Sequence, residues 1–487
     1  MSEKKEYSAV VTAQDNVKKI NFYDETIEKS CDRIINSSDG VSNETMTFHM
    51  PQTTDRVFTD LTSTEIIWKL QLLTGEGGEI PTGQNVGLIN QFVQSQMESI
   101  KVELNGKEVW GSGNYYPELS YIDAQTKWSK EDKDTWGWTE GYIEDNGVNA
   151  TSPEFTTNLA NLNRAMFFGD LTQDEESDDL FDDGDGDDPN PPDPPTPPKV
   201  PKLKYRTKPT TFRCPIRGGI FEADNHLPPR TNLTVKITMK PSKYVLFTSD
   251  ALAGNSYQLK VKGCSIKFRQ LTSTKKYWDE YVANWKENPV KLRFSRIPAI
   301  SINLTTTSLD QEHQIKNAGI NPKRIMIVFR DAKYVKPANN INPLYFTNFF
   351  ESPNSTAASR KYVDLEKLEL CMGGVPLNDL RDMAENRLSL TMLHYRQFLN
   401  HFYKYGHSGL GLYNFQYGRY IVAYDLSTTQ RLNEGPMVRE PVNNEDLRLT
   451  IKLSNSPKEQ VQCLVFSEYE CSVTIDFNST IVQNFFD

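Results

Sequence analysis

The chain has 487 residues, with 54 Lys and Arg against 64 Asp and Glu, which gives a formal net charge of −10. Aromatic residues make up 11% of it, and it contains 27 Gly and 27 Pro. This composition excludes collagen-like, coiled-coil and wholly disordered chains, and the length allows two large β domains. No apolar stretch approaches 18 residues and the N-terminus is polar, so we expect neither a transmembrane helix nor a secretory signal.

Residues 1–40 are polar and follow no sustained period, so we expect a flexible N-terminal arm. From residue 41 onward, alternation with a period of two dominates, which is typical of half-buried strands. Residues 100–104 alternate in this way and lead into Asn105-Gly106, the signature of a two-residue hairpin turn. Residues 257–268 alternate too, but their parity changes at Gly263-Cys264, which predicts a bulge or a bend.

One segment carries almost all of the net charge. Residues 174–193 contain eleven Asp and Glu and neither Lys nor Arg, so the other 467 residues have a net charge of only +1. A nearly neutral surface argues against a sequence-specific nucleic-acid binder, which needs cations for the phosphates. The acidic run leads into a proline-rich stretch, and we expect a disordered acidic and Pro-rich insertion at about 170–205.

The second half of the chain also predicts mainly strands. Residues 324–329 form a continuous apolar run, which indicates a strand covered on both faces, and residues 461–475 alternate. Two helices are predicted, over 275–287 and over about 378–403. Strands with few helices between Gly, Pro and Asn turns indicate an all-β sandwich or jelly-roll class.

Two short strand patterns occur twice in the same order. KVEL at 101–104 resembles KLEL at 367–370, and LTVKI at 233–237 resembles LRLTI at 447–451. The interval between the two patterns is longer in the first copy, and the acidic segment accounts for most of the difference. We therefore predict that this segment is an insertion inside the first unit, and that the units meet near 272–288.

The short motifs of the chain favour structural roles. The glycine-rich stretch at 75–78 lacks the Lys of a phosphate loop, and the calcium-like run at 183–187 has Pro194 where a closing Glu is needed. The six His form no pair with metal-ligand spacing, and the six Cys form no Cys-x-x-Cys motif. Four of these Cys lie in alternating stretches typical of buried strands, which favours a reducing compartment. We interpret Trp278 and Trp285 as packing residues. The sequence thus indicates no catalytic, cofactor-binding or metal-binding residue, no cofactor and no enzyme.

An ordered series of motifs covers residues 45–487. It consists of LINQFVQS (88–95), NGK (105–107), YPELSY (116–121), PIRGGIF (215–221), FSRIP (294–298), NPKRIMIV (321–328), NPLYFTN (342–348) and YGRYIVAYDL (417–426). This series resembles the double jelly-roll, hexon-like major capsid proteins of Polinton/Maverick elements and adintoviruses. The chain departs from that pattern in its acidic insertion and in Gly373-Gly374, which replaces the Asn-Gly-Lys hairpin in the second half.

The resemblance implies two tandem eight-stranded jelly rolls with few short helices. The first roll would span 41–272, a connecting helix 273–288 and the second roll 289–487. The chain would be a structural major capsid protein whose homotrimers act as pseudo-hexameric blocks of an icosahedral shell. Its partners would be neighbouring capsomers, a minor (penton) capsid protein and, through the arm, an inner membrane. It would be assembled inside the host cell and be part of the virion.

Two alternatives stay open from the sequence. A carbohydrate-binding or glycan-acting protein built on two β-sandwiches would need a concave pocket with convergent polar groups between them. A single-jelly-roll minor capsid protein is disfavoured, because the chain contains two sets of strands.

Overall fold

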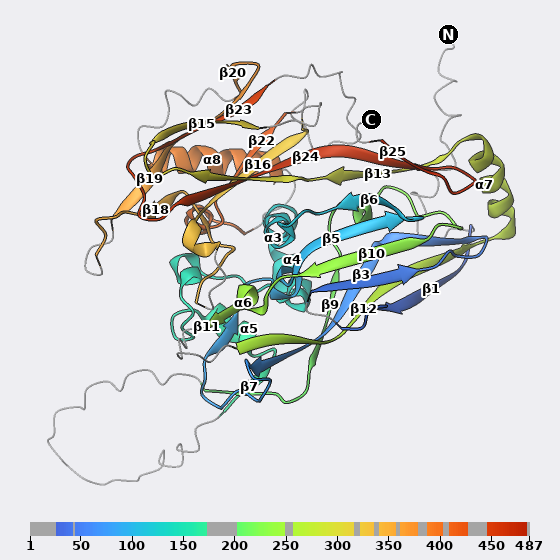
Figure 1. Ribbon diagram of the computed structural model, residues 1–487, viewed down its shortest axis with the longest axis horizontal. Helices are drawn as coiled ribbons and strands as arrows, with labels where there is room; N and C mark the ends of the chain where they lie inside the picture. The colour runs from blue at the N-terminus through green and yellow to red at the C-terminus, as the bar shows by residue number, and fades with distance from the viewer. Residues whose placement is uncertain are drawn as a thin grey trace, which may run out of the picture.

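The computed structural model describes residues 26–41, 44–172, 202–248, 257–315, 322–335, 340–356, 361–377, 387–402, 409–426 and 446–484. Within these ranges the chain forms two β-sandwiches that lie one above the other in Figure 1, with α7 (Lys275–Glu287) at one end between them. The first sandwich runs from blue to green and the second from yellow to red. The predicted all-β class with two jelly rolls is confirmed.

The first roll has two four-stranded antiparallel sheets. One has the order β1 (Ile27–Asn36), β12 (Tyr257–Ser273), β3 (Val57–Thr74) and β9 (Thr210–Pro215); the other has the order β2 (Thr45–Met50), β10 (Leu233–Met239), β5 (Met97–Leu104) and β6 (Lys107–Gly111). Along β10, buried residues alternate strictly with half-buried ones, so Leu233, Val235 and Ile237 point into the core. The period of two in the sequence thus reflects one face buried between the sheets.

The second roll repeats this topology strand by strand. One sheet has the order β13 (Val290–Arg296), β24 (Val461–Ile475), β16 (Arg324–Asp331) and β22 (Ile421–Asp425). The other has the order β15 (Asp310–Ile315), β23 (Leu447–Leu453) and β19 (Tyr362–Met372). Two short strands, β18 (Phe349–Glu351) and β20 (Val375–Pro376), both pair with β19. In each roll, the first, eighth, third and sixth principal strands make one sheet, and the second, seventh, fourth and fifth make the other. The repeated sequence patterns lie in equivalent strands: β5 pairs with β10 as β19 pairs with β23.

Local features predicted from the sequence are present in the first roll. Asn105 and Gly106 have φ values of 48° and 80°, the two left-handed residues of a type I′ turn that joins β5 to β6. The register between β12 and β3 shifts between Val261 and Gly263, so the predicted bulge is confirmed. In the second roll, β16 is buried along almost its whole length, as its continuous apolar run predicts.

Shorter elements fill the connections. Between β6 and β9 the chain forms α3 (Tyr116–Lys127), α4 (Lys130–Asp134), η1 (Trp136–Glu140), η2 (Gly147–Thr151), α5 (Leu159–Ala165), β7 (Gly169–Leu171) and β8 (Leu203–Tyr205); between β20 and β22 it forms α8 (Arg387–Phe402), α9 (Leu412–Gln416) and β21 (Tyr417–Gly418). The remaining elements are β4 (Val86–Leu88), α2 (Phe92–Ser95), η3 (Gly219–Glu222), α6 (Ser242–Val245), β11 (Leu246–Thr248), β14 (Ala299–Leu304), η4 (Ala332–Tyr334), β17 (Phe346–Thr347) and β25 (Ile481–Asn484). No sequence pattern predicted α3, because ten of its residues are buried and no polar face gives it a helical period.

Two expectations need correction. The prediction of a flexible arm over 1–40 is wrong for residues 27–36, which form the edge strand β1. The side chains of β1 are mostly exposed, so backbone pairing with β12, and not burial of one face, stabilises the strand. The insertion expected at about 170–205 is ordered at both ends, where Gly169 pairs with Tyr205 and Leu171 with Leu203. Residues 1–25, 173–201 and the part 378–386 of the expected second helix lie outside the described residues.

Candidate functional site

The motifs that carry the family resemblance meet at the junction of the two rolls. The YPELSY motif forms the first half of α3, which lies directly below the second roll in Figure 1. The NPLYFTN motif contains β17, and the YGRY part of the last motif contains β21, which pairs with β17. The ring of Tyr121 on α3 lies 5.9 Å from the ring of Phe346 on β17. The sequence marked these positions but gave them no role; the structure makes them the contact between the rolls.

A buried ion pair links α3 to the second roll. The guanidinium of Arg330 on β16 lies 3.0 Å from Oε1 of Glu118, and their side chains are only 3% and 1% exposed. Arg330 also donates to Oε1 of Gln462 at 2.8 Å and to the carbonyl of Pro343 at 2.6 Å. The hydroxyl of Tyr244 donates to the same carboxylate oxygen of Glu118 at 3.0 Å. Losing either charge would leave the other buried and uncompensated, so the pair specifies how the rolls dock.

A second buried arginine of the second roll enters a loop of the first. Arg419 donates to the carbonyl of Asp145 at 2.8 Å and pairs with the carboxylate of Glu144. The Asp145 carboxylate in turn binds the fully buried Arg164 at 2.8 Å, and Arg164 donates to the carbonyl of Leu88 at 2.6 Å. The loop that receives Arg419 is therefore held in place by a buried cation of its own roll.

The strand β25 and the turn before it accept hydrogen bonds from, and donate to, the predicted β5–β6 hairpin. Asn105 donates to the carbonyl of Ser479 at 2.8 Å, and Lys107 to that of Ile481 at 3.1 Å. Gln483 donates to the carbonyl of Val109 at 2.8 Å. The hairpin turn of the first roll thus also serves as a contact for the second.

Aromatic residues close the junction beside α7. Trp285 is buried and its indole N–H donates to the carbonyl of Ile475 at 3.0 Å. Its ring lies 5.3 Å from that of Phe477, and the cations of Arg230 and Lys286 lie 5.2 and 5.3 Å from the Phe477 ring. Trp278 is also buried, so the interpretation of both tryptophans as packing residues is confirmed.

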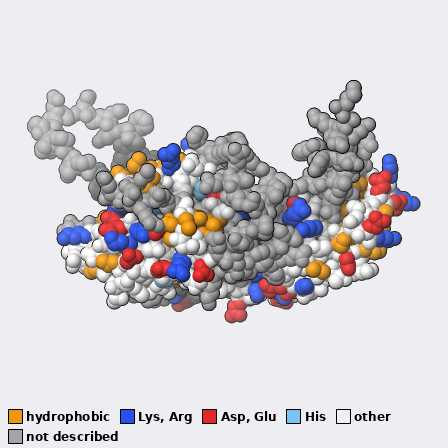
Figure 2. Space-filling view, turned by 90° about the horizontal axis from the view of Figure 1, so that it is seen from above, with side chains coloured by type: hydrophobic (Ala, Val, Ile, Leu, Met, Phe, Trp, Pro, Cys, Tyr) orange, Lys and Arg blue, Asp and Glu red, His pale blue; other side chains and the backbone are white. Residues whose placement is uncertain are grey.

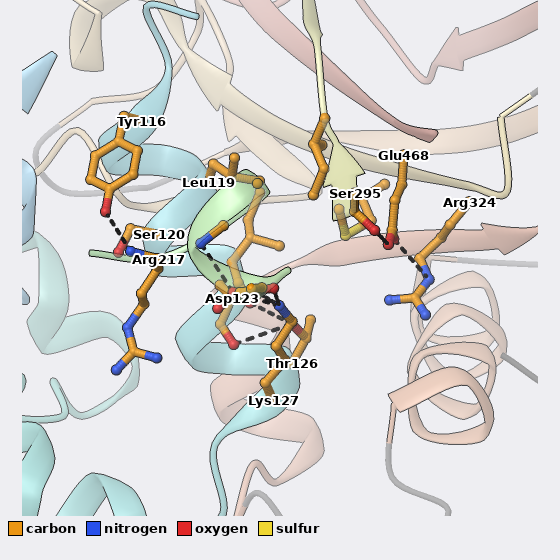
Figure 3. Close-up of a pocket in the computed structure, with 16 residues that line it drawn as sticks. Tyr116, Leu119, Ser120, Asp123, Thr126, Lys127, Arg217, Ser295, Arg324 and Glu468 are labelled. Atoms are coloured by element: carbon orange, nitrogen blue, oxygen red, sulfur yellow. Dashed lines mark hydrogen bonds and ion pairs between the residues drawn. The ribbon is translucent and has the colours of Figure 1, made fainter. Parts of the chain in front are cut away.

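A cavity of about 40 Å³ lies between the rolls (Figure 3). On the side of the first roll, Lys127 lies 2.7 Å from Asp123 and 3.0 Å from Glu222. On the other side, the Ser295 hydroxyl donates to Glu468 at 2.9 Å, and Arg324 lies 3.7 Å from the same carboxylate. These charged groups lie in ion pairs with one another, and a volume of about 40 Å³ has room for a few waters.

The buried carboxylate of this cavity stays ionised. Burial raises the pKa of Glu468, but Arg324, Lys323 and Lys127 outweigh burial and hold that pKa below its ordinary value. A general acid needs the opposite, a carboxyl group whose raised pKa keeps it protonated. The Glu468 carboxylate therefore suits a structural ion pair and not a general acid.

The described part of the chain contains no group of three or more His, Cys, Asp or Glu side chains that could hold a metal ion. The six cysteines all lie in the described ranges and none of them forms a disulfide; Cys214, Cys264, Cys463 and Cys471 are buried, as four were expected to be. Among the helices of the described ranges, none is long and apolar enough to span a membrane.

No family model and no curated protein matches the chain. Solved structures do match over nearly its full length. A chain in the cryo-EM structure of the Sputnik virophage aligns with a TM-score of 0.61 at 11% identity, over 94% of this chain and 89% of that one. This chain has the double jelly-roll fold of viral capsid proteins. The PBCV-1 virus capsid aligns with a TM-score of 0.54 at 9% identity, over 96% and 99% of the two chains, and the faustovirus major capsid protein with 0.54 at 10%, over 91% and 90%.

Proposed function

We propose that this protein is a structural major capsid protein whose trimers tile an icosahedral shell. The observation that carries the proposal is the repetition of one eight-stranded topology in a single chain, with the two rolls docked through buried ion pairs. Three such chains would present six similar rolls around one axis, which is a pseudo-hexameric block. A head-to-tail contact that closes after three steps generates such a ring.

The junction suits a mechanical role. A tiling block needs its two rolls at a fixed angle, because an error in that angle would accumulate across the shell. Buried arginines with several fixed acceptors supply this constraint better than apolar contacts alone, since they tolerate only one arrangement of partners. Arg330, on β16, and Arg419, which directly follows β21, both provide it.

The surface is compatible with repeated contacts between copies. Figure 2 shows acidic and basic side chains interspersed on one face of the molecule, with small apolar groups between them. Such a surface favours contacts with neighbouring capsomers and with a minor (penton) capsid protein over binding of specific nucleic-acid sequences. Residues 1–25, which precede β1, would reach a neighbour or an inner membrane. We place the protein in the virion, after assembly inside the host cell, and in the Polinton/adintovirus lineage that its motifs resemble.

The glycan-acting alternative finds no support at the junction. It needs a pocket between the sandwiches large enough for a sugar, whereas the cavity lined by described residues of both rolls measures about 40 Å³ and its charged groups lie in ion pairs. The single-roll minor capsid alternative disagrees with the two rolls of the chain. We therefore propose that the protein is not an enzyme.

The mass of the purified protein in solution tests the proposal. One chain has a mass of 55.7 kDa, so a trimer gives about 167 kDa, three times that value. Light scattering should show the trimer, and negative-stain images should show blocks with a hexagonal outline. A species that stays at the mass of one chain up to high concentration would contradict the proposal.

A further inference from the structure

The outer face of the sheet β1-β12-β3-β9 is open, whereas its counterpart in the second roll is covered. In the second roll β16 and β22 are buried on both faces, and α8 packs against β22. In the first roll, outward-pointing side chains on β3, β9 and β12 reach solvent; they include Lys69, Arg213 and Lys262, which are exposed, and Lys260, which is half-buried. We call these four residues the basic face.

The residues of the basic face are neighbours across the sheet. Gly263 pairs with Lys69, so Lys262 at the bulge lies beside it, and a Cβ atom placed on Gly263 would lie 3.2 Å from Cδ of Lys69. Lys69 and Ile67 pair with Thr211 and Arg213 of β9, and Lys260 pairs with Gln71. Adjacent strands are about 4.8 Å apart, so the four charges share one small area.

The basic face has no anionic partner among the described residues. Two other cations of this sheet are compensated, since Lys267 lies 2.7 Å from Glu65 and Arg269 lies 3.7 Å from Asp32. No carboxylate in the described ranges lies within ion-pair distance of Lys69, Arg213, Lys260 or Lys262. Like charges on adjacent strands repel one another, so an anion on this face would be stabilising.

The acidic segment 174–193 has the charge and the attachment to supply that anion. Its eleven carboxylates follow directly after Thr172, and the chain returns through Lys202 into β8. From there it enters the basic face itself: Gln71 of β3 donates to the carbonyl of Thr207 at 2.6 Å, and β9 begins at Thr210. A tether this short gives the segment a local concentration on the order of millimolar at the face.

We propose that the basic face is a docking surface for the acidic segment 174–193 of the same molecule. Docked there, the segment neutralises the four cations and keeps other polyanions, such as nucleic-acid phosphates, off the sheet. The contact is electrostatic and exposed, so it weakens as salt shortens the screening length from about 8 Å at physiological ionic strength to about 3 Å at 1 M. This proposal stands independently of the capsid function.

Acylation of lysines followed by mass spectrometry tests the docking in the full-length protein. The variant neutralises the segment at constant length, with its eleven Asp and Glu changed to Asn and Gln. Lys276, an exposed residue of α7, is the internal control. At low salt, Lys69, Lys260 and Lys262 should react about tenfold more slowly, relative to Lys276, in the native protein than in the variant. The difference should disappear in 1 M salt.

Two further measurements identify the occupant. Zero-length carboxyl–amine cross-links in a mixture of isotope-labelled and unlabelled protein should join the segment to the face within one copy. The neutralised variant should bind a DNA oligonucleotide more tightly than the native protein, and the change of Lys69, Lys260 and Lys262 to Gln should remove that gain.

Equal acylation rates in both proteins, or cross-links only between copies, would overturn the proposal. The mass in solution is read separately, so failure of the docking is distinguishable from failure of the trimer.

Discussion

Glu118→Gln tests the buried ion pair between the rolls. The substitution keeps the size of the side chain and an oxygen for the Tyr244 hydroxyl, but it removes the negative charge 3.0 Å from Arg330. The Arg330 side chain is 3% exposed, so its charge would then lie buried with only the neutral acceptors of Gln462 and Pro343. Removing one partner of a buried pair costs about 3–5 kcal/mol, and the two retained hydrogen bonds favour the lower end, about 3 kcal/mol.

The matched control is Glu312→Gln. Glu312 lies 3.1 Å from Arg448, and both side chains are about half exposed, at 56% and 53%. Water solvates this pair, so the loss should be below about 1 kcal/mol. Unfolding in guanidinium chloride, followed by tryptophan fluorescence, gives the free energy of unfolding of each variant. A double replacement, Glu118→Gln with Arg330→Gln, removes both charges while keeping a hydrogen-bonding group at each position for Tyr244, Gln462 and Pro343, and should recover part of the loss.

Two results would refute this reasoning. Equal losses for Glu118→Gln and Glu312→Gln would mean that burial does not set the energy of the pair. A double variant less stable than Glu118→Gln would mean that packing, rather than the uncompensated charge, is responsible.

Burial lowers the pKa of His394 to about 3, so between about pH 6.5 and 3 the unfolded chain binds a proton there that the folded chain does not. Stability should therefore fall as pH drops through this window, and His394→Gln should make the unfolding midpoint depend less on pH between 7 and 4; an unchanged slope would contradict the assignment. Gly106→Ala should cost about 1 kcal/mol in a thermal melt, because φ is 80° and only backbone strain is added, whereas Gly111→Ala, outside the left-handed region, should cost less. Phe477→Ala should lower stability by about 1–3 kcal/mol and speed hydrogen exchange at the Trp285 indole, and unchanged exchange would count against the aromatic contact. A reducing agent should leave the melting temperature unchanged, because the six cysteines form no disulfide in the described ranges; a drop would reveal one.

The junction explains why the motif series mattered more than any single motif. Glu118, Arg330 and Arg419 come from separate motifs or strands, and no neighbouring residue in the sequence marks any of them as buried. A buried charge and an exposed one look alike in a sequence, because burial depends on chain that is distant along it. The only available signal was the spacing of YPELSY, NPLYFTN and YGRY in a fixed order.

Strands with one face in the core could be predicted from the amino-acid order, since burial on one side of a pleated strand imposes a period of two within a few residues. The same holds for the Asn105-Gly106 turn and the bulge before Gly263, whose causes are local backbone conformations. The repeat of strand order was also readable, because equivalent strands of two rolls need similar residues. The structure confirms each of these features.

Tertiary contacts decided the rest. β1 has mostly exposed side chains and is defined by backbone hydrogen bonds to β12, which leave no trace in residue type. The helix α3 is enclosed on nearly every side, so no polar face could reveal it. The pairing of Glu118 with Arg330 arises only when the two rolls meet, because neither charge can be buried until the other roll supplies its partner.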